Sequence, residues 1–121
     1  MHLVYLLRCA DGTLYTGYTT DLARRLRQHN AGTGAKYTRA RRPVAVVVAW
    51  EFPTKGLALS AEYRIRKLRL PQKQGLIDKA FLPPELGSLG PVALGSEHAE
   101  DLQGPGGRGA LSPDAPEAPA S

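Results

Sequence analysis

The sequence predicts a single α/β domain, and three observations support this fold class. Two short runs of apolar and aromatic residues, 3–8 and 13–18, flank the turn signal Ala10-Asp11-Gly12 and predict a β-hairpin. A continuous, mostly β-branched run over residues 44–50 is typical of a central strand buried on both faces. Two longer segments carry apolar side chains at the spacing of an α-helix.

The turn of the hairpin decides which tyrosines share a face of the sheet. A two-residue Asp11-Gly12 loop puts Tyr5 opposite Tyr18 and leaves Tyr15 on the other face. A three-residue loop closed by a left-handed glycine instead brings Tyr5, Tyr15 and Gly17 to one face. One residue of register moves every side chain to the other face, so the two loops make opposite predictions.

The segment after the hairpin predicts a helix over residues 21–31. Thr19 or Thr20 is expected to cap its N-terminus, with Asp21 in the first turn. The spaced positions of this helix are Leu22, Leu26 and His29. The histidine therefore extends the apolar stripe of the helix.

A basic loop is expected over residues 33–43, before the third strand. Residues 54–69 then predict a second amphipathic helix that begins at Thr54. Its apolar stripe is expected to consist of Leu57, Ala61, Ile65 and Leu68. Pro71 is expected to break this helix, and residues 72–80 are expected to form a short third one.

The composition of the chain changes from Pro83 onward. Residues 83–121 contain 7 Gly and 7 Pro and no aromatic residue, and no helical or strand period runs through them. We therefore expect a domain over residues 1–82 and a disordered, Gly/Pro-rich acidic tail over residues 83–121.

The net charge of +5 is unevenly distributed along the chain. Residues 1–82 hold 15 of the 16 Lys and Arg and 5 of the 11 Asp and Glu, a net charge of +10, whereas residues 83–121 carry −5. A basic domain of this kind favours a polyanionic partner, most often nucleic acid. A soluble basic protein with a solvated surface is the alternative.

The single cysteine, Cys9, excludes an intrachain disulfide and a multi-cysteine metal site. We interpret it as a packing residue beside the apolar run 3–7. No apolar run approaches the roughly 18 residues needed to span a membrane. Arg8 ends the first apolar run too early for a signal peptide. A cytoplasmic protein is therefore expected, with a monomer as the default.

The order and spacing of several motifs resemble one nuclease family. Tyr5 and the triplet Tyr15-Thr16-Gly17 are followed by Arg25 and His29 on the first predicted helix, and by Glu62 further on. This ordered set resembles the GIY-YIG nuclease superfamily, most closely its small stand-alone, single-domain members. Four shorter motifs also look like that group: Ala10-Asp11-Gly12, His29-Asn30-Ala31-Gly32, Lys36-Tyr37-Thr38-Arg39 and Ala61-Glu62-Tyr63-Arg64-Ile65.

The resemblance implies both a fold and a chemistry. The implied fold is a small three-stranded antiparallel sheet flanked by helices, an α/β fold of the α+β type. The implied activity is hydrolysis of phosphodiester bonds with a single divalent metal ion, Mg²⁺ or Mn²⁺, held by one carboxylate. A phenol helps to deliver water to the phosphorus.

Glu62 is the carboxylate that the resemblance assigns to the metal ion. Mg²⁺ often takes only one or two carboxylates together with substrate oxygens. The helical wheel puts Glu62 at the edge of the apolar stripe, from where it can face the sheet. The alternative is an i, i+4 ion pair with Arg66.

Tyr5, Tyr15, Arg25 and His29 are the other candidate catalytic residues. One tyrosine is expected to act as general base and the other to position phosphate or water, and the sequence leaves open which is which. A phenol has a pKa of about 10, which Arg25 and a bound metal ion would lower. His29 can accept a proton from a tyrosine or contact the phosphate. The alternatives are strand aromatics and a histidine at the core margin.

A further set of residues is assigned to nucleic-acid binding: Gly17, Tyr18, Lys36, Tyr37, Arg39, Arg41, Arg42 and Lys73. Most of them lie in the basic loop, which suits phosphate contacts, although a solvated loop is the alternative. Larger family members carry an asparagine downstream of the metal-binding glutamate, where this chain has Pro71-Gln72-Lys73-Gln74. Lys73 is interpreted as a substitute phosphate contact.

Together these features predict an endonuclease that cuts DNA, or alternatively RNA, in repair or processing. Because the sequence shows no second domain that could read a base sequence, we expect structure-selective or weakly selective cleavage. The alternative functions are a non-catalytic nucleic-acid-binding module of the same fold and a protein-interaction module.

Overall fold

The computed structural model describes residues 1–94, so the expected acidic tail lies outside the described residues from residue 95 onward. A four-stranded antiparallel sheet forms the middle layer of the molecule, in the order β2-β1-β3-β4. Its strands are β1 (His2–Arg8), β2 (Leu14–Thr19), β3 (Ala45–Phe52) and β4 (Gly90–Pro91).

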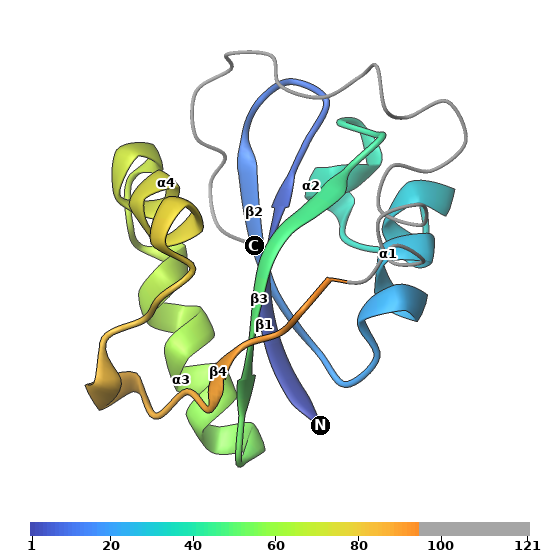
Figure 1. Cartoon of the computed structure of the whole chain (residues 1–121). Coiled ribbons are helices and arrows are strands. Elements are labelled where there is room, and N and C mark those ends of the chain that lie inside the picture. The colour runs from blue at the N-terminus through green and yellow to red at the C-terminus, as the bar shows by residue number, and fades with distance from the viewer. Residues whose placement is uncertain (95–121) are drawn as a thin grey trace.

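Helices cover both faces of this sheet. They are α1 (Leu22–Ala31), α2 (Lys36–Arg39), α3 (Lys55–Arg66), α4 (Leu70–Lys79) and the short 3₁₀ helix η1 (Pro84–Leu86). Helices α1 and α2 lie on one side of the strands, and α3 and α4 lie on the other (Figure 1). The predicted α+β fold, an antiparallel sheet flanked by helices, is confirmed.

The hairpin of β1 and β2 has the register of the three-residue loop. Tyr5 pairs with Gly17, and Leu7 pairs with Tyr15. The Cys9 N–H donates to the Thr13 carbonyl at 2.8 Å, and Gly12 closes the loop with a φ of 86°. Only the left-handed region offers this φ, and glycine enters it without steric cost. Tyr5, Tyr15 and Gly17 therefore share a face.

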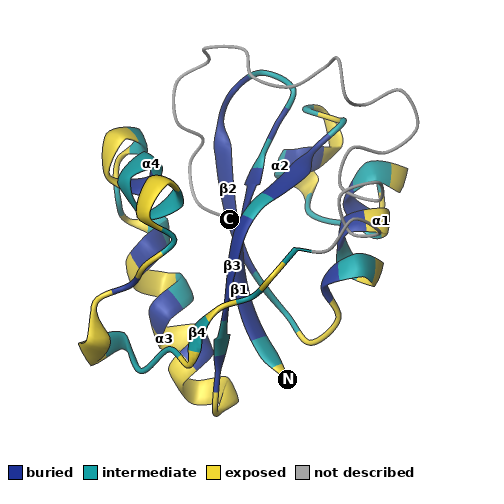
Figure 2. Cartoon of the chain, viewed as in Figure 1, coloured by how far each residue is buried: buried dark blue, intermediate teal, exposed yellow. Residues whose placement is uncertain are grey.

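Two hydrophobic clusters anchor the helices to the two faces of the sheet. On one face, Tyr5 and Leu7 pack with Leu22 and Leu26 of α1. On the other face the cluster includes Val4, Leu6, Trp50, Ala61 and Ile65. Figure 2 shows this burial along the strands and on the inner sides of the helices. The alternation of strand side chains thus assigns each residue of β1 to one of two cores.

The N-terminus of α1 differs from the sequence prediction of a threonine cap. Asp21 is the N-cap, and its carboxylate accepts a hydrogen bond from the Arg24 N–H at 3.1 Å. Thr19 instead accepts the Asp21 N–H at 3.0 Å, one step before the helix. The extended φ of −148° at Asp21 is that of an N-cap residue, so Asp21 lies outside the first turn.

The expected basic loop over residues 33–43 contains the one-turn helix α2. Thr54 caps α3 as predicted, with its side chain accepting from Leu57 N–H at 3.1 Å. The buried row of α3 consists of Ala58, Ala61 and Ile65. Leu57 was the wrong choice for this row, because it is 39% exposed.

Pro71 lies inside the first turn of α4, whereas the sequence suggests that it precedes this helix. The first turn of a helix tolerates proline, because the N–H groups there have no intrahelical partner. Helix α4 therefore begins at Leu70, whereas α3 already ends at Arg66.

The segment 83–94 also differs from the prediction, because it contains η1 and β4 and makes the sheet four-stranded. The Leu89 N–H donates to the Glu51 carbonyl at 2.7 Å, and the Val92 N–H donates to the Ala49 carbonyl at 2.8 Å. These bonds use the backbone only. A Gly-Pro strand of two residues has no side-chain pattern that a sequence could display.

None of the helices among residues 1–94 is long and apolar enough to cross a lipid bilayer.

One side chain ties α1 to the start of β3. The Asn30 side-chain amide donates to the Val44 carbonyl at 3.1 Å, and its carbonyl oxygen accepts from the Val44 N–H at 2.8 Å. Val44 is fully buried, so both of its backbone groups depend on this amide. The pair holds the C-terminal end of α1, and with it His29, in place.

We expect Asn30→Ala to lower the free energy of unfolding by about 2–4 kcal/mol, because it leaves two buried backbone groups of Val44 without partners. Asn30→Asp keeps an acceptor for the Val44 N–H and is expected to lose less. Urea unfolding of the two variants measures the difference, and equal stability of Asn30→Ala and the wild type would contradict the role of this amide.

Candidate active site

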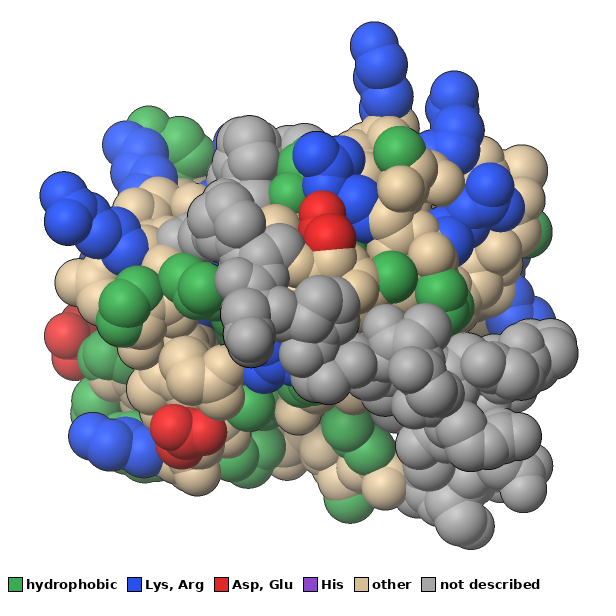
Figure 3. Space-filling model, turned by 90° about the horizontal axis from the view of Figure 1, so that it is seen from above, with side chains coloured by type: hydrophobic (Ala, Val, Ile, Leu, Met, Phe, Trp, Pro, Cys, Tyr) green, Lys and Arg blue, Asp and Glu red, His purple; other side chains and the backbone are tan. Residues whose placement is uncertain are grey.

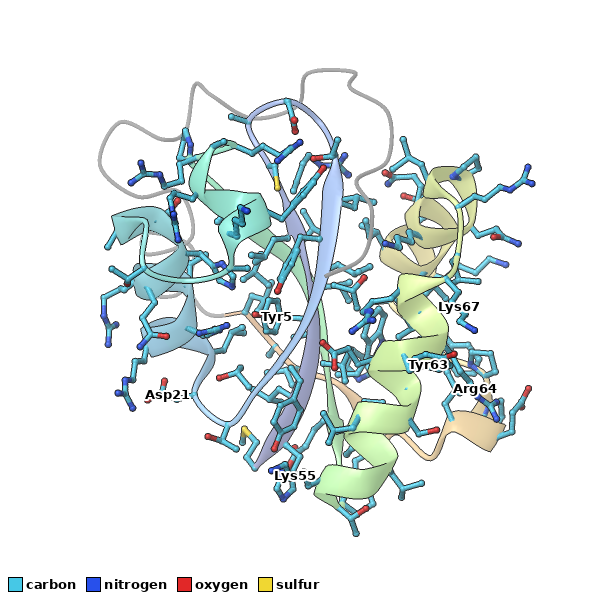
Figure 4. The ribbon with its side chains drawn as sticks, turned by 180° about the vertical axis from the view of Figure 1, so that it is seen from behind. Tyr5, Asp21, Lys55, Tyr63, Arg64 and Lys67 are labelled. Atoms are coloured by element: carbon cyan, nitrogen blue, oxygen red, sulfur yellow. The ribbon has the colours of Figure 1, made fainter. Side chains whose placement is uncertain are left out.

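The ring of Tyr5 lies across Gly17 on the neighbouring strand. A Cβ atom at residue 17 would lie 2.9 Å from Cε1 of Tyr5 and closer still to its Cζ and hydroxyl oxygen. Gly17 is therefore needed for close approach, since its own φ imposes no such demand. Tyr5 is 1% exposed and lies between the strands and helices α1 and α2 (Figure 4).

The Tyr5 hydroxyl begins a chain of buried hydrogen bonds. It lies 3.0 Å from Nε2 of His29, and Nδ1 of His29 lies 2.7 Å from the Thr38 hydroxyl. The Thr38 hydroxyl in turn donates to the Ala35 carbonyl at 3.0 Å. His29 and Thr38 are both fully buried. Strand β1, helix α1 and helix α2 each supply one member of this chain.

The hydrogen-bond directions assign the tautomer of His29. Because the Thr38 hydrogen points to the Ala35 carbonyl, the Thr38 oxygen accepts from Nδ1–H of His29. Nε2 is then an acceptor, and the Tyr5 O–H donates to it. The Ala35 N–H lies 3.5 Å from Nδ1, too far to compete with the Thr38 contact.

Burial shifts both members of the Tyr5–His29 pair toward their neutral forms. Burial and the adjacent Arg25 charge lower the pKa of His29 to about 4. Burial, together with the nearby Tyr15, raises the pKa of Tyr5 far above its ordinary value, and Arg25 opposes this shift only in part. The sequence predicts that Arg25 lowers the pKa of a phenol. In the protein without metal or substrate, the desolvation of Tyr5 outweighs the effect of the Arg25 charge.

Tyr15 contacts the same histidine through its ring. The ring centroids of Tyr15 and His29 are 5.3 Å apart at an interplanar angle of 65°. Tyr5 and Tyr15 lie 6.5 Å apart. Of the two tyrosines, Tyr5 is the one whose hydroxyl has a histidine as proton acceptor.

A stack of side chains continues from Tyr15 to the surface. Tyr37 stacks on Tyr15, with centroids 6.3 Å apart and ring planes inclined by 13°. The Arg41 guanidinium lies 3.6 Å above the centre of the Tyr37 ring, and its Nε is paired with Asp11 at 3.0 Å. Arg41 also donates to the Tyr37 carbonyl at 2.9 Å. Two of the residues assigned to nucleic-acid binding are thus engaged in internal contacts.

Asp11 secures this stack from the hairpin loop. Its carboxylate accepts from the backbone N–H of Thr13 at 3.1 Å and from the Thr13 hydroxyl at 2.6 Å. Partial burial alone would raise its pKa, but the Thr13 hydrogen bonds and the Arg41 charge hold that pKa below its ordinary value. The neighbouring Cys9 is buried, and burial raises its pKa to about 11, which agrees with the predicted packing role.

Arg25 lies half-buried at the edge of the same site. Its Nη1 donates to Oε1 of Gln28 at 3.1 Å, and its charge acts on both Tyr5 and His29. It lines a surface hollow of about 320 Å³ between the end of β2 and α1, together with Tyr18 and Arg24. Tyr18 is held from the other side by a 2.9 Å hydrogen bond to His2.

Glu62 approaches the site from α3, on the opposite face of the sheet. It is half-buried, and its charge acts on Tyr5. Burial raises its pKa, and Arg66 opposes this shift in part. The described residues contain no group of three or more His, Cys, Asp or Glu side chains that could hold a metal ion. A single carboxylate such as Glu62 fits a hard cation that takes its other ligands from water and substrate, as Mg²⁺ does.

The remaining candidates for nucleic-acid binding lie at different depths. Lys36, Arg39 and Arg42 are exposed on and after α2, whereas Lys73 is fully buried on α4. Arg42 is directed by bonds to the Arg39 carbonyl at 2.8 Å and the Asn30 carbonyl at 3.4 Å. In Figure 3, Lys and Arg side chains stand over the α1–α2 side and over the α4 side of the molecule.

The site also uses residues whose roles the sequence does not indicate. Thr38 orients His29, Asp11 holds Arg41, Gln28 holds Arg25, and Asn30 fixes the end of α1. Three of them belong to motifs that resemble the nuclease family, but a motif states no contact partner. Thr38 lies nine residues from His29, and only the fold of α2 against α1 brings them together.

Comparison with known proteins identifies the family of the chain. Residues 1–75 match the family model of the GIY-YIG catalytic domain. The chain belongs to the GIY-YIG family. A UPF0213 protein of Halobacterium salinarum is 54% identical over 76 residues, which cover 63% of this chain and 99% of that protein. A UPF0213 protein of Halalkalibacterium halodurans is 49% identical over 76 residues, 63% of this chain and 81% of that protein.

One solved structure is also similar to this GIY-YIG chain. It is the solution NMR structure of a UPF0213 protein from Bacillus halodurans, 46% identical in sequence. The match covers 70% of this chain and 90% of the other, with a TM-score of 0.45.

The His29 pKa predicts a defined loss of stability in acid. In the unfolded chain His29 takes up a proton near pH 6.5, whereas in the folded protein it does so only at about pH 4. Between these values the unfolded state binds more protons, so stability falls as the pH drops from 6.5 to about 4. Below about pH 4 both states are protonated and this contribution changes no further.

Urea unfolding at a series of pH values measures this effect. We expect His29→Gln to remove the part of the pH dependence that lies in this window. A variant with the same slope as the wild type would contradict the assignment of a neutral, buried His29.

Proposed function

We propose that this protein is a metal-dependent endonuclease that hydrolyses phosphodiester bonds in DNA. The observation that carries the proposal is the hydrogen bond from Tyr5 to an unprotonated Nε2 of His29, which gives a buried phenol a proton acceptor. Membership of the GIY-YIG family supports the reaction class. We further propose structure-selective or weakly selective cutting in DNA repair or processing.

In this proposal Tyr5 is the general base. A water molecule that attacks the phosphorus would form a new P–O bond as the P–O bond to the leaving oxygen breaks. It would transfer a proton to the Tyr5 oxygen, while the Tyr5 proton passes to Nε2 of His29. The Thr38 hydroxyl holds the His29 tautomer that can accept this proton. The negative phosphate and the protonated imidazole would then stabilise each other, which counteracts the unfavourable burial of His29.

Arg25 is proposed to bind the non-bridging oxygens of the scissile phosphate. The charge of its guanidinium acts on both Tyr5 and His29, and a hydrogen bond to Gln28 holds the guanidinium in place. A guanidinium can donate two parallel hydrogen bonds to a phosphate and offset charge that develops in the transition state. Tyr15, whose ring packs against His29, is proposed to position the phosphate or the water.

Glu62 is proposed to hold a single divalent ion, Mg²⁺ or Mn²⁺. When bound, such an ion supplies Lewis-acid stabilisation of the phosphate oxygens and of the leaving group. The raised pKa of Glu62 agrees with a carboxylate placed where a cation would compensate its burial. A neutral side chain at residue 62 would lack the negative charge that binding a divalent cation requires.

The exposed cations of α2 and the segment after it are proposed to contact the DNA backbone. Lys36, Arg39 and Arg42 are exposed on and after α2, the helix whose Thr38 contacts His29. Contacts to phosphates position a strand without reading its bases, which is why we propose weak sequence selectivity. A non-catalytic module would use the same cations, so only a cleavage assay separates the two functions.

The decisive assay uses branched, nicked, single-stranded and duplex DNA with Mg²⁺ or Mn²⁺. We expect cleavage by the wild type, abolition by a chelator, and a loss of at least about 100-fold for Glu62→Ala, because the metal contribution is worth several kcal/mol. Glu85→Ala, an exposed acidic residue on η1, is the matched control and should cut normally. Undiminished cutting by Glu62→Ala would overturn the metal assignment, and salt-dependent binding without any cutting would select the non-catalytic module.

Tyr5→Phe tests the general base. Loss of a general base slows the reaction by about 10²- to 10⁴-fold, and we expect a reduction in this range. Tyr63→Phe removes a phenol oxygen from the outer side of α3 and serves as the control, since Tyr63 is 54% exposed. Equal cleavage rates for Tyr5→Phe and Tyr63→Phe would assign the base elsewhere.

A further inference from the structure

The middle residue of the Tyr15-Thr16-Gly17 triplet has a hydroxyl that the fold does not use. Thr16 is fully buried, and its Oγ1 has no hydrogen-bond partner. Strand alternation directs it away from the Tyr15 face and toward the face that α3 covers. Because a buried, unsatisfied hydroxyl is destabilising, valine of nearly the same shape would serve the fold better. A bound ligand that accepts a hydrogen bond would supply the partner that this hydroxyl lacks.

Arg66 supplies a second unused donor on the same face. It lies in the last turn of α3, one turn after Glu62, and its charge acts on the Glu62 carboxyl. Its Nε is buried and also lacks a hydrogen-bond partner. A guanidinium presents its N–H groups as a planar fork that matches two oxygens of a phosphate.

The surroundings of Thr16 and Arg66 favour an anion. Arg8 extends from the same face of β1, and Gln74 of α4 accepts from it at 2.9 Å. Lys73 precedes Gln74 and is buried. The acidic side chains of α3 and α4 are Glu62, which is half-buried, and Asp78, which is exposed and accepts a hydrogen bond from Gln74 at 3.0 Å. Hydroxyl and guanidinium donors beside further cations suit an oxyanion and do not suit a metal ion.

We propose that this face of β2 binds a second phosphate of the nucleic-acid strand, with the Thr16 hydroxyl and the Arg66 guanidinium as its donors. The inference rests on the proposed function, because it takes the anion to be a phosphodiester next to the one that Arg25 binds. Glu62 would then lie between two phosphate contacts, one on each face of the edge strand β2. The strand would cross the sheet edge beside Gly17, over which the Tyr5 ring lies.

Binding is measured in the presence of a chelator, so that cleavage plays no part. The probe is a short fluorescent DNA strand, its dissociation constant is followed by anisotropy, and urea unfolding reports stability. We expect Thr16→Val to raise the urea midpoint and yet to bind the strand about 10-fold more weakly, as the loss of a hydrogen bond to a charged group implies. Thr16→Ser keeps the hydroxyl and should keep the affinity.

Arg66→Gln and Arg64→Gln form a matched pair on one helix. Arg64 lies on the outer side of α3, away from the strands (Figure 4). Arg66→Gln is expected to weaken binding by about 10-fold and to reduce the salt slope by about one, whereas Arg64→Gln leaves both unchanged. Equal affinities for these two variants, or a wild-type affinity for Thr16→Val, would overturn the proposal.

Two further outcomes separate this site from its alternatives. If inorganic phosphate raises the urea midpoint of the wild type and not of Thr16→Val, while both bind DNA equally, the site serves a free phosphate and the proposal is wrong. If Thr16→Val and Arg66→Gln both weaken DNA binding but the wild type never cuts with Mg²⁺ or Mn²⁺, the phosphate site stands and the nuclease function fails.

Discussion

The close contact of the Tyr5 ring with Gly17 is the interaction on which the rest of the site depends. It requires that residues 5 and 17 face each other, and this requirement selects a single hairpin register. In that register the Tyr5 hydroxyl reaches His29, and the Tyr15 ring packs beside the same imidazole. A side chain at residue 17 would push the phenol away from its acceptor. The absence of a methyl group at this one position therefore preserves the hairpin register, the Tyr5–His29 hydrogen bond and the packing of the Tyr15 ring.

For the candidate site, the sequence predicts which residues lie together better than it predicts their contacts. The helical spacing of Leu22, Leu26 and His29 correctly turns the histidine toward the sheet, because local periodicity is a property of the chain itself. The hairpin register stayed open, since both loops obey the rules for tight turns and differ only in long-range packing. Thr38 could not be assigned for the same reason, as its partner is defined by how two helices meet.

The pKa shifts and the pairing of charged groups were the properties that the sequence predicted least well. Counting charges suggests that Arg25 lowers the pKa of a neighbouring phenol, but the count contains no measure of burial. In the folded chain desolvation dominates at Tyr5 and His29. Arg41 shows the same limit, because a cation in a basic segment reads as a surface group until its pairing with Asp11 and its stacking on Tyr37 are seen.

The short strand β4 has a consequence for how the molecule meets its neighbours. A sheet edge with unpaired backbone groups is a template for pairing with another chain, and this sheet has two outer strands. At one edge, residues 89–92 bond to the backbone of β3 beside Trp50 and shield it. The opposite edge, β2, is where the phenols, the guanidinium and the carboxylate converge. Among residues 1–94 the protection is thus one-sided, and the edge without a neighbouring strand is the one beside which the proposed catalytic residues lie.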